Sequence, residues 1–171
     1  KRRRLALLRA ALVPPGGPDA QLETARTLEL VIDKVRSFGG RIEGLGPIGA
    51  VAVFGLSEIG DAADRAGHSA MAIVKAVERA RREDGAETAV KIGIHVGVAL
   101  VGVGPGPGAT ELDMDERRDL WPMLDELVER ASLGSILVTD PAASLLMRRF
   151  ELTPSPGPPD KARAHVLIGL E

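Results

Sequence analysis

The densest group of residues in this sequence that could do chemistry is a cluster of acids. Glu111, Asp113, Asp115 and Glu116 lie together in the segment ELDMDERRD (111–119). Hard divalent cations prefer carboxylate oxygens, so this cluster is a candidate for loose cation binding. The cluster follows a run broken by glycine and proline, and the interpretation that we favour is a solvated, exposed loop.

Other nucleophiles and ligands are isolated in the sequence. Cysteine is absent, which excludes a thiol nucleophile, a disulfide and thiolate metal ligands. His95 lies on the small-residue face of the alternating stretch VKIGIHVGVALVG, so we predict a packed or hydrogen-bonded histidine rather than a general base. His68 and His165 have no sequence neighbours that indicate a site. The GPGPG run at 104–108 resembles a phosphate-binding loop in glycine content only, because no Lys-Ser/Thr pair follows it.

Length and composition are typical of one globular domain. The chain has 171 residues, 44% of them hydrophobic, and a net charge of -2. Charges of both signs are scattered, which argues against nucleic-acid or membrane partners, and we expect a cytoplasmic protein. The basic run Lys1 to Arg4 is interpreted as the solvated start of a strand. Because that strand begins almost at the first residue, we expect residues 1–171 to be a single domain excised from a longer multidomain protein.

The elements that would position these residues follow from periodicity and from turn residues. We expect strands at 3–13, 41–45, 49–55, 90–102, 136–138, 150–152 and 165–168, and helices between Asp19 and Gly39 and at 61–84, 119–131 and 141–147. This order predicts an α+β fold with a ferredoxin-like antiparallel sheet and helices packed on one face. Trp121 stands near the expected start of the third helix, either as an exposed contact point or, as we favour, as a cover on the core.

Four stretches resemble one known family. They are FGGRIEGLGPIGAVAVFG, the helix DAADRAGHSAMAIVKAVERAR, the strand VKIGIHVGVALVG and ERASLGSILVTDPAASLL. Together they resemble the catalytic domain of class III adenylate and guanylate cyclases, from about Arg4 to Leu170. The resemblance implies a nucleotide-cyclase-like version of the α+β fold, and its alignment is weakest between Gly104 and Asp119.

The resemblance also implies where catalytic metals would bind. In the family, two aspartates, at the end of the first strand and in the hairpin turn, hold two divalent ions. Their positions fall on Ala11 and on Ile48, which stands beside Pro47. Neither aliphatic side chain can ligate a cation, so we expect no metal and no cofactor.

The remaining family positions carry other residue types as well. The adenine-selecting lysine falls at Gly44, and the transition-state Asn and Arg fall at Pro122 and Glu126. A glutamate there would repel the charge that phosphoryl-transfer chemistry develops. Asp119 alone matches a base-recognition position. These substitutions predict that the chain is not an enzyme.

The functional hypothesis that follows is a catalytically inactive cyclase-homology domain, acting as a regulatory or dimerisation module in a bacterial signalling protein. We expect a homodimer, or a heterodimer with another cyclase-like domain, together with contacts to other domains of the same polypeptide. One alternative is a nucleotide cyclase that needs a complementary partner chain. Another is a nucleotide-binding sensor without turnover.

Overall fold

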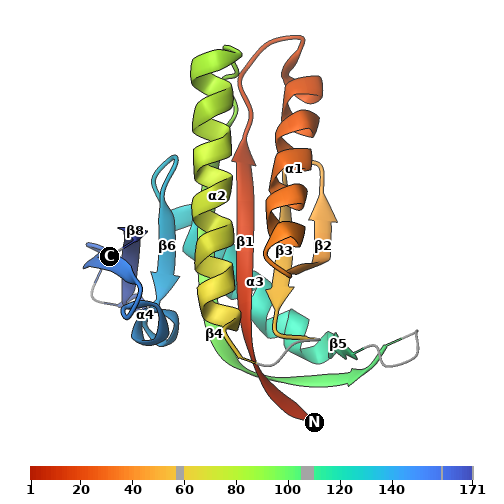
Figure 1. Ribbon diagram of the computed structural model, residues 1–171, viewed down its shortest axis with the longest axis vertical. Coiled ribbons are helices and arrows are strands. Elements are labelled where there is room, and N and C mark those ends of the chain that lie inside the picture. The colour runs from red at the N-terminus through yellow and green to blue at the C-terminus, as the bar shows by residue number, and fades with distance from the viewer. Residues whose placement is uncertain (57–59, 105–109, 159, 171) are drawn as a thin grey trace.

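A computed structural model describes residues 1–56, 60–104, 110–158 and 160–170. Figure 1 labels the elements, whose bounds are β1 (Arg2–Val13), α1 (Ala20–Ser37), β2 (Arg41–Gly46), β3 (Gly49–Phe54), α2 (Ala62–Glu83), β4 (Ala89–Val103), β5 (Thr110–Leu112), α3 (Met114–Arg130), β6 (Ile136–Thr139), α4 (Asp140–Leu146), β7 (Phe150–Pro154) and β8 (Ala164–Leu170). Among the described helices, none is long and apolar enough to cross a bilayer.

The described strands form one sheet. Its strand order is β2-β3-β1-β4-β6-β8-β7, and β5 pairs with β4. The neighbours of β1, which are β3 and β4, are both antiparallel to it, and among the described strands only the β4–β6 pair is parallel. The predicted α+β fold with a mostly antiparallel sheet is therefore confirmed.

Helices cover both faces of this sheet. Even-numbered residues of β1 such as Ala6 and Leu8 join the main core beneath α1, α2 and α4, whereas Leu5 and Leu7 pack on the other face with Leu124 of α3. Figure 1 shows α1 and α2 in front of β1 and α3 behind it. The expectation that all helices pack on one face needs correction for α3. The unbroken apolar run of β1 is the reason, because it is buried on both sides.

The small face of β4 makes room for α3. A side chain at Gly93 would place its Cβ about 3.0 Å from Leu127 Cδ2, so α3 lies directly against the strand backbone there. The alternation of large and small residues predicted for β4 thus corresponds to two packing environments. Its large residues fill the main core, and its small residues accommodate a helix.

The acidic segment is ordered secondary structure rather than the predicted loop. β5 pairs with β4, and α3 begins at Met114, five residues before the predicted start. Asp113 is the N-cap, and its side chain accepts a hydrogen bond of 2.9 Å from the backbone N–H of Asp115. Acids in the first turn also suit the positive end of the helix. Most of the GPGPG run lies outside the described residues.

Candidate functional site

A cavity of about 420 Å³ lies between β1, the β2–β3 hairpin and α3. Charged or aromatic side chains on its walls are Arg9, Glu43, Arg117, Trp121 and Asp125, and the hairpin adds Gly44, Leu45, Gly46, Ile48, Gly49 and Val51. Two positions selected from the sequence, Gly44 and Ile48, are therefore brought together here. We treat this cavity as the candidate active site.

Trp121 and Gly44 form a complementary pair in the cavity wall. A Cβ added to Gly44 would lie 3.0 Å from the indole Nε1, so the tryptophan occupies the space that a side chain would need. The rest of the indole packs on the apolar cluster between the sheet and α3, which confirms that Trp121 covers the core. The Arg117 guanidinium lies 5.5 Å from the centre of the indole ring, within cation–π range.

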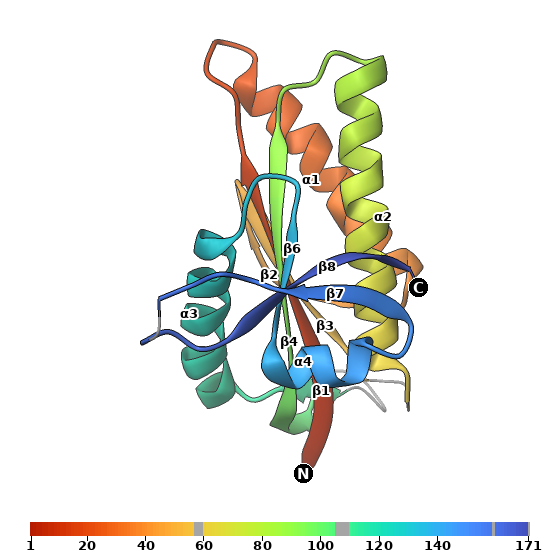
Figure 2. The same ribbon diagram turned by 90° about the vertical axis from the view of Figure 1, so that its left-hand side faces the viewer.

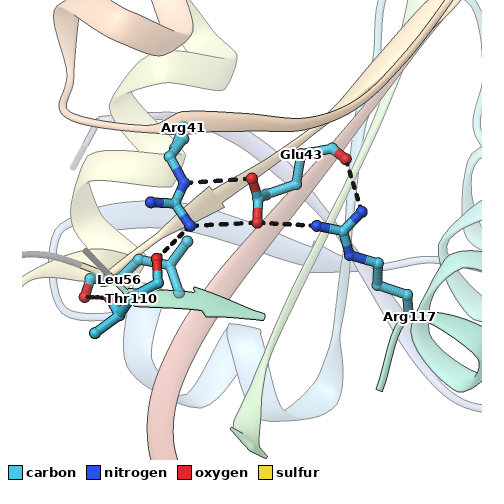
Figure 3. A network of polar contacts seen from close by, with 5 residues as sticks. All are labelled: Arg41, Glu43, Leu56, Thr110 and Arg117. Carbon is cyan, nitrogen blue, oxygen red and sulfur yellow. Dashed lines mark hydrogen bonds and ion pairs between the residues drawn. The ribbon is translucent and has the colours of Figure 1, made fainter. Parts of the chain in front are cut away.

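Glu43 is the centre of a polar network that joins the hairpin to α3 (Figure 3). Its carboxylate accepts hydrogen bonds from Arg41 Nε at 3.3 Å, Arg41 Nη2 at 3.4 Å and Arg117 Nη2 at 3.1 Å. Its backbone carbonyl accepts another from Arg117 Nη1 at 3.2 Å. The Glu43 side chain is only 10% exposed. This network therefore fixes one wall of the cavity.

The same network extends to β5. Arg41 Nη2 donates to the carbonyl of Thr110, and the Thr110 hydroxyl donates to the carbonyl of Leu56 (Figure 3). Sequence analysis did not select Arg41, Glu43 or Arg117. The only local signal was the Arg-Ile-Glu spacing, which puts Arg41 and Glu43 two residues apart on one strand.

Arg9 forms the opposite wall. Its Nε donates to Asp125 Oδ1 at 3.1 Å, and its Nη1 donates to the carbonyls of Ala10 at 3.2 Å and Ala50 at 3.4 Å. The guanidinium lies over Gly49, where an added Cβ would approach Nη1 to 2.4 Å. Because the Asp125 side chain is 64% exposed and that of Arg9 only 20%, water competes for the carboxylate more than for the guanidinium.

Of the two positions that the family resemblance assigns to metal ligands, Ile48 lines this cavity and Ala11 lies beside it in the sheet. Ala11 pairs with Gly49, the residue after Ile48, and the Ile48 side chain is 51% exposed at the hairpin tip. The nearest cavity carboxylates, Glu43 and Asp125, are already paired with arginines. Within the described residues, no group of three or more acids or histidines could hold a metal ion. The described residues at and around these two positions therefore do not fit the two-metal arrangement of the family.

Solved structures share this architecture along the whole chain, although no family model and no curated protein matches the sequence. The non-canonical dimeric guanylyl cyclase domain of the RhoGC fusion protein from Blastocladiella emersonii has a TM-score of 0.80, 15% identity and coverage of 100% of this chain and 99% of its own. The guanylate cyclase domain of RhGC from Catenaria anguillulae, in complex with GTP, gives 0.77 and 16%, covering 100% of both chains. Adenylyl cyclase CyaB from P. aeruginosa gives 0.78 and 14%, covering 98% of this chain and 95% of its own.

The chain has the class III nucleotide cyclase fold. This finding corrects the prediction that the chain is not an enzyme. The three solved structures described above are guanylyl and adenylyl cyclase domains, and one of them holds GTP. That prediction rested only on the residue types at positions assigned from the sequence.

The positions on α3 that the family resemblance selected do not lie in the same cavity as the hairpin positions Gly44 and Ile48. Asp119 and Pro122 are exposed and line neither the candidate active site nor a second cavity of about 300 Å³ that includes Glu126. Glu126 Oε1 accepts a hydrogen bond of 2.8 Å from Lys161 Nζ, which lowers the pKa of the Glu126 carboxyl and raises that of Lys161. The Glu126 carboxylate, which the sequence predicted would repel a developing negative charge, is paired with Lys161 in the structure.

Each of the three histidines in this chain contacts another side chain. His95 Nδ1 lies 2.9 Å from the Thr139 hydroxyl, and burial lowers the pKa of His95, which confirms the predicted hydrogen-bonded residue. The His68 ring lies between Phe38 and Phe150, with ring centres 6.1 and 5.0 Å away. His165 Nε2 lies 2.5 Å from Asp140 Oδ1, a pairing between distant segments that sequence analysis missed.

Proposed function

We propose that this domain is one half of a two-chain purine nucleotide cyclase, binding the nucleotide in the hairpin–α3 cavity. One observation carries the proposal. The cavity combines an indole and guanidinium groups with the aliphatic Ile48 at one family metal position, and the other such position, Ala11, pairs with Gly49 of the cavity wall. It therefore has the chemistry to hold a nucleotide but lacks the carboxylates that activate one.

Each cavity wall matches one part of a nucleoside triphosphate. The exposed part of Trp121 offers a ring for stacking, as purine bases require. Arg9 is the group best suited to phosphate, since guanidinium pairs with phosphate bidentately and its present partner, Asp125, is largely solvated. Arg117 is paired with the buried Glu43 carboxylate, so we assign it a structural role rather than phosphate binding.

A partner chain would supply the missing groups. Metal-binding carboxylates and transition-state donors must both come from it, because Ala11, Ile48, Pro122 and Glu126 offer neither in this chain. Two copies of this chain would still lack the metal ligands, so we propose a heterodimer with another cyclase-like domain as the active form. Exposed Leu45 and Ile48 at the hairpin give the cavity mouth the uncharged character of an interface core.

The proposal also covers how the activity of this domain would be regulated. We propose that residues 1–171 act as one domain and that association with further domains controls the two-chain enzyme. Support for association comes from the fold, since one protein with this fold was crystallised as a dimer of guanylyl cyclase domains.

Cyclic nucleotide formation tests the function. The isolated domain should form none from ATP or GTP with Mg²⁺ or Mn²⁺. Mixing it with a cyclase domain that carries both metal aspartates should raise that domain's output, and Arg9→Gln should reduce the increase. Arg26→Gln, an exposed arginine on α1, is the matched control. Turnover by the isolated domain that a chelator abolishes would contradict the need for a partner.

A further inference from the structure

A third cavity, of about 470 Å³, lies where the N-terminal end of β1 meets the start of α2 and the end of α4. Figure 2 shows these three segments at the end of the molecule that carries the N-terminus. Four arginines line this cavity: Arg3, Arg4, Arg148 and Arg149. Asp61 and Asp64 are its only acids among the described residues, so the walls carry a net charge of +2 (four arginines minus two aspartates).

Two of these arginines are already engaged. Arg149 Nε lies 3.4 Å from Asp64 Oδ2, and Arg3 Nη1 donates to the backbone carbonyls of Leu56 and, at 3.4 Å, Gly55. Arg4 and Arg148 differ from them, because neither makes an ion pair or a side-chain hydrogen bond within the described part of the chain. Within the described part of the chain, two guanidinium groups therefore line the same cavity without forming an ion pair.

The start of α2 adds to this positive potential. The N-cap residue Asp61 has a left-handed backbone (φ 55°) and its side chain makes no capping hydrogen bond. The backbone N–H groups of Ala62 and Ala63, which also line the cavity, therefore lack a side-chain cap. Uncapped N–H groups at the start of a long helix favour anions, although the guanidinium groups are the main attraction here.

We infer that this cavity binds a small molecule that carries a phosphate group. Guanidinium forms bidentate, charge-assisted hydrogen bonds with phosphate oxygens, and two unpaired arginines beside one cavity can bind the same group. The volume lies within the range of about 300–1,000 Å³ that small-molecule sites occupy. The anion can be inorganic phosphate, pyrophosphate or the phosphates of a nucleotide.

This site is separate from the hairpin–α3 cavity. Arg4 and Arg9 are both on β1, but Arg4 is an even-numbered residue beside α2 and α4, whereas Arg9 contacts Asp125 of α3 on the opposite face. Five residues of strand separate them by roughly 17 Å. The inference of phosphate binding here does not rest on the proposed cyclase function. A ligand bound at this site would leave the hairpin–α3 cavity unoccupied.

Isothermal titration calorimetry with inorganic phosphate, pyrophosphate and ATP, each without metal, tests the site. We expect saturable binding of at least one probe, weakened at least tenfold in Arg4→Gln/Arg148→Gln and in Arg148→Gln alone. Arg148 is exposed, so the single variant should fold normally, which circular dichroism checks. Arg79→Gln, an exposed arginine in the second half of α2, is the control with the same charge change.

The three probes identify the source of the phosphate. Tightest binding of inorganic phosphate, pyrophosphate or ATP assigns the site to a free anion, a diphosphate or a nucleotide, respectively. Because ATP can also enter the hairpin–α3 cavity, only the part of its binding that Arg148→Gln removes is assigned to the arginine-lined cavity at the start of α2. Absence of saturable binding up to 10 mM of every probe, an unchanged affinity in the Arg148→Gln variants, or an equal loss in Arg79→Gln would each overturn the inference.

Discussion

Replacing Glu43 with alanine should destabilise the domain, because it removes the centre of the polar network at the cavity. The carboxylate accepts three hydrogen bonds from Arg41 and Arg117, and hydrogen bonds to charged groups contribute about 1.5–3 kcal/mol each. The two arginine side chains are 40% and 26% exposed, so both regain water when the carboxylate is lost. We therefore expect the free energy of unfolding to fall by about 2–3 kcal/mol.

Urea denaturation followed by circular dichroism measures this change. In a domain of this size the melting temperature should fall by about 4–12 °C. Glu43→Gln should lose less, because its amide oxygen still accepts one hydrogen bond. Asp33→Ala is the control, since Asp33 is 69% exposed and its pairing with Lys34 at 3.8 Å should contribute under about 0.5 kcal/mol. A loss in Glu43→Ala no larger than in this control would refute the network as a structural element.

Three further predictions concern single groups. Gly44→Lys should displace the Trp121 indole, because the new Cβ would lie 3.0 Å from its Nε1, and should shift tryptophan emission to longer wavelength; unchanged emission would contradict the packing. Lys161→Met should raise the pKa of Glu126 towards its ordinary value, as NMR titration can measure, whereas an unchanged pKa would rule out the ion pair. Burial lowers the pKa of His95 below 6.5, so the stability that its neutral ring contributes is complete above pH 6.5 and is lost as the pH falls through the folded-state pKa. NMR should find that midpoint below 6.5, and a midpoint above it would contradict the prediction.

Local patterns were sufficient to predict most of the fold. The apolar run of β1 and the alternation in β4 identified two central strands, and the Gly46-Pro47 pair identified the hairpin. The start of α3 was missed because Pro122, which disfavours a helix interior, lies within this helix. Asp113, followed by acids, was the available signal for the true N-terminus.

The candidate site was harder to predict because its contacts join distant segments. Arg9 and Asp125 are 116 residues apart in the chain, and Glu43 and Arg117 are 74 apart. Neither pairing follows from sequence spacing, since both depend on α3 packing across the second face of the sheet. The family resemblance selected Gly44 and Ile48 in the cavity but not the charged groups around them. Cytoplasmic location and bacterial origin remain predictions from sequence.

Titration of GTP into the isolated domain, followed by fluorescence of the single tryptophan, tests the central claim most directly, because Trp121 lines the proposed nucleotide cavity. We predict a saturable change that Arg9→Gln weakens at least tenfold. Asp125→Asn, which releases Arg9 from its carboxylate, should strengthen binding, and Arg26→Gln should leave it unchanged. No saturable change, or a change of the same affinity in the Arg9 and Asp125 variants, would contradict nucleotide binding in this cavity.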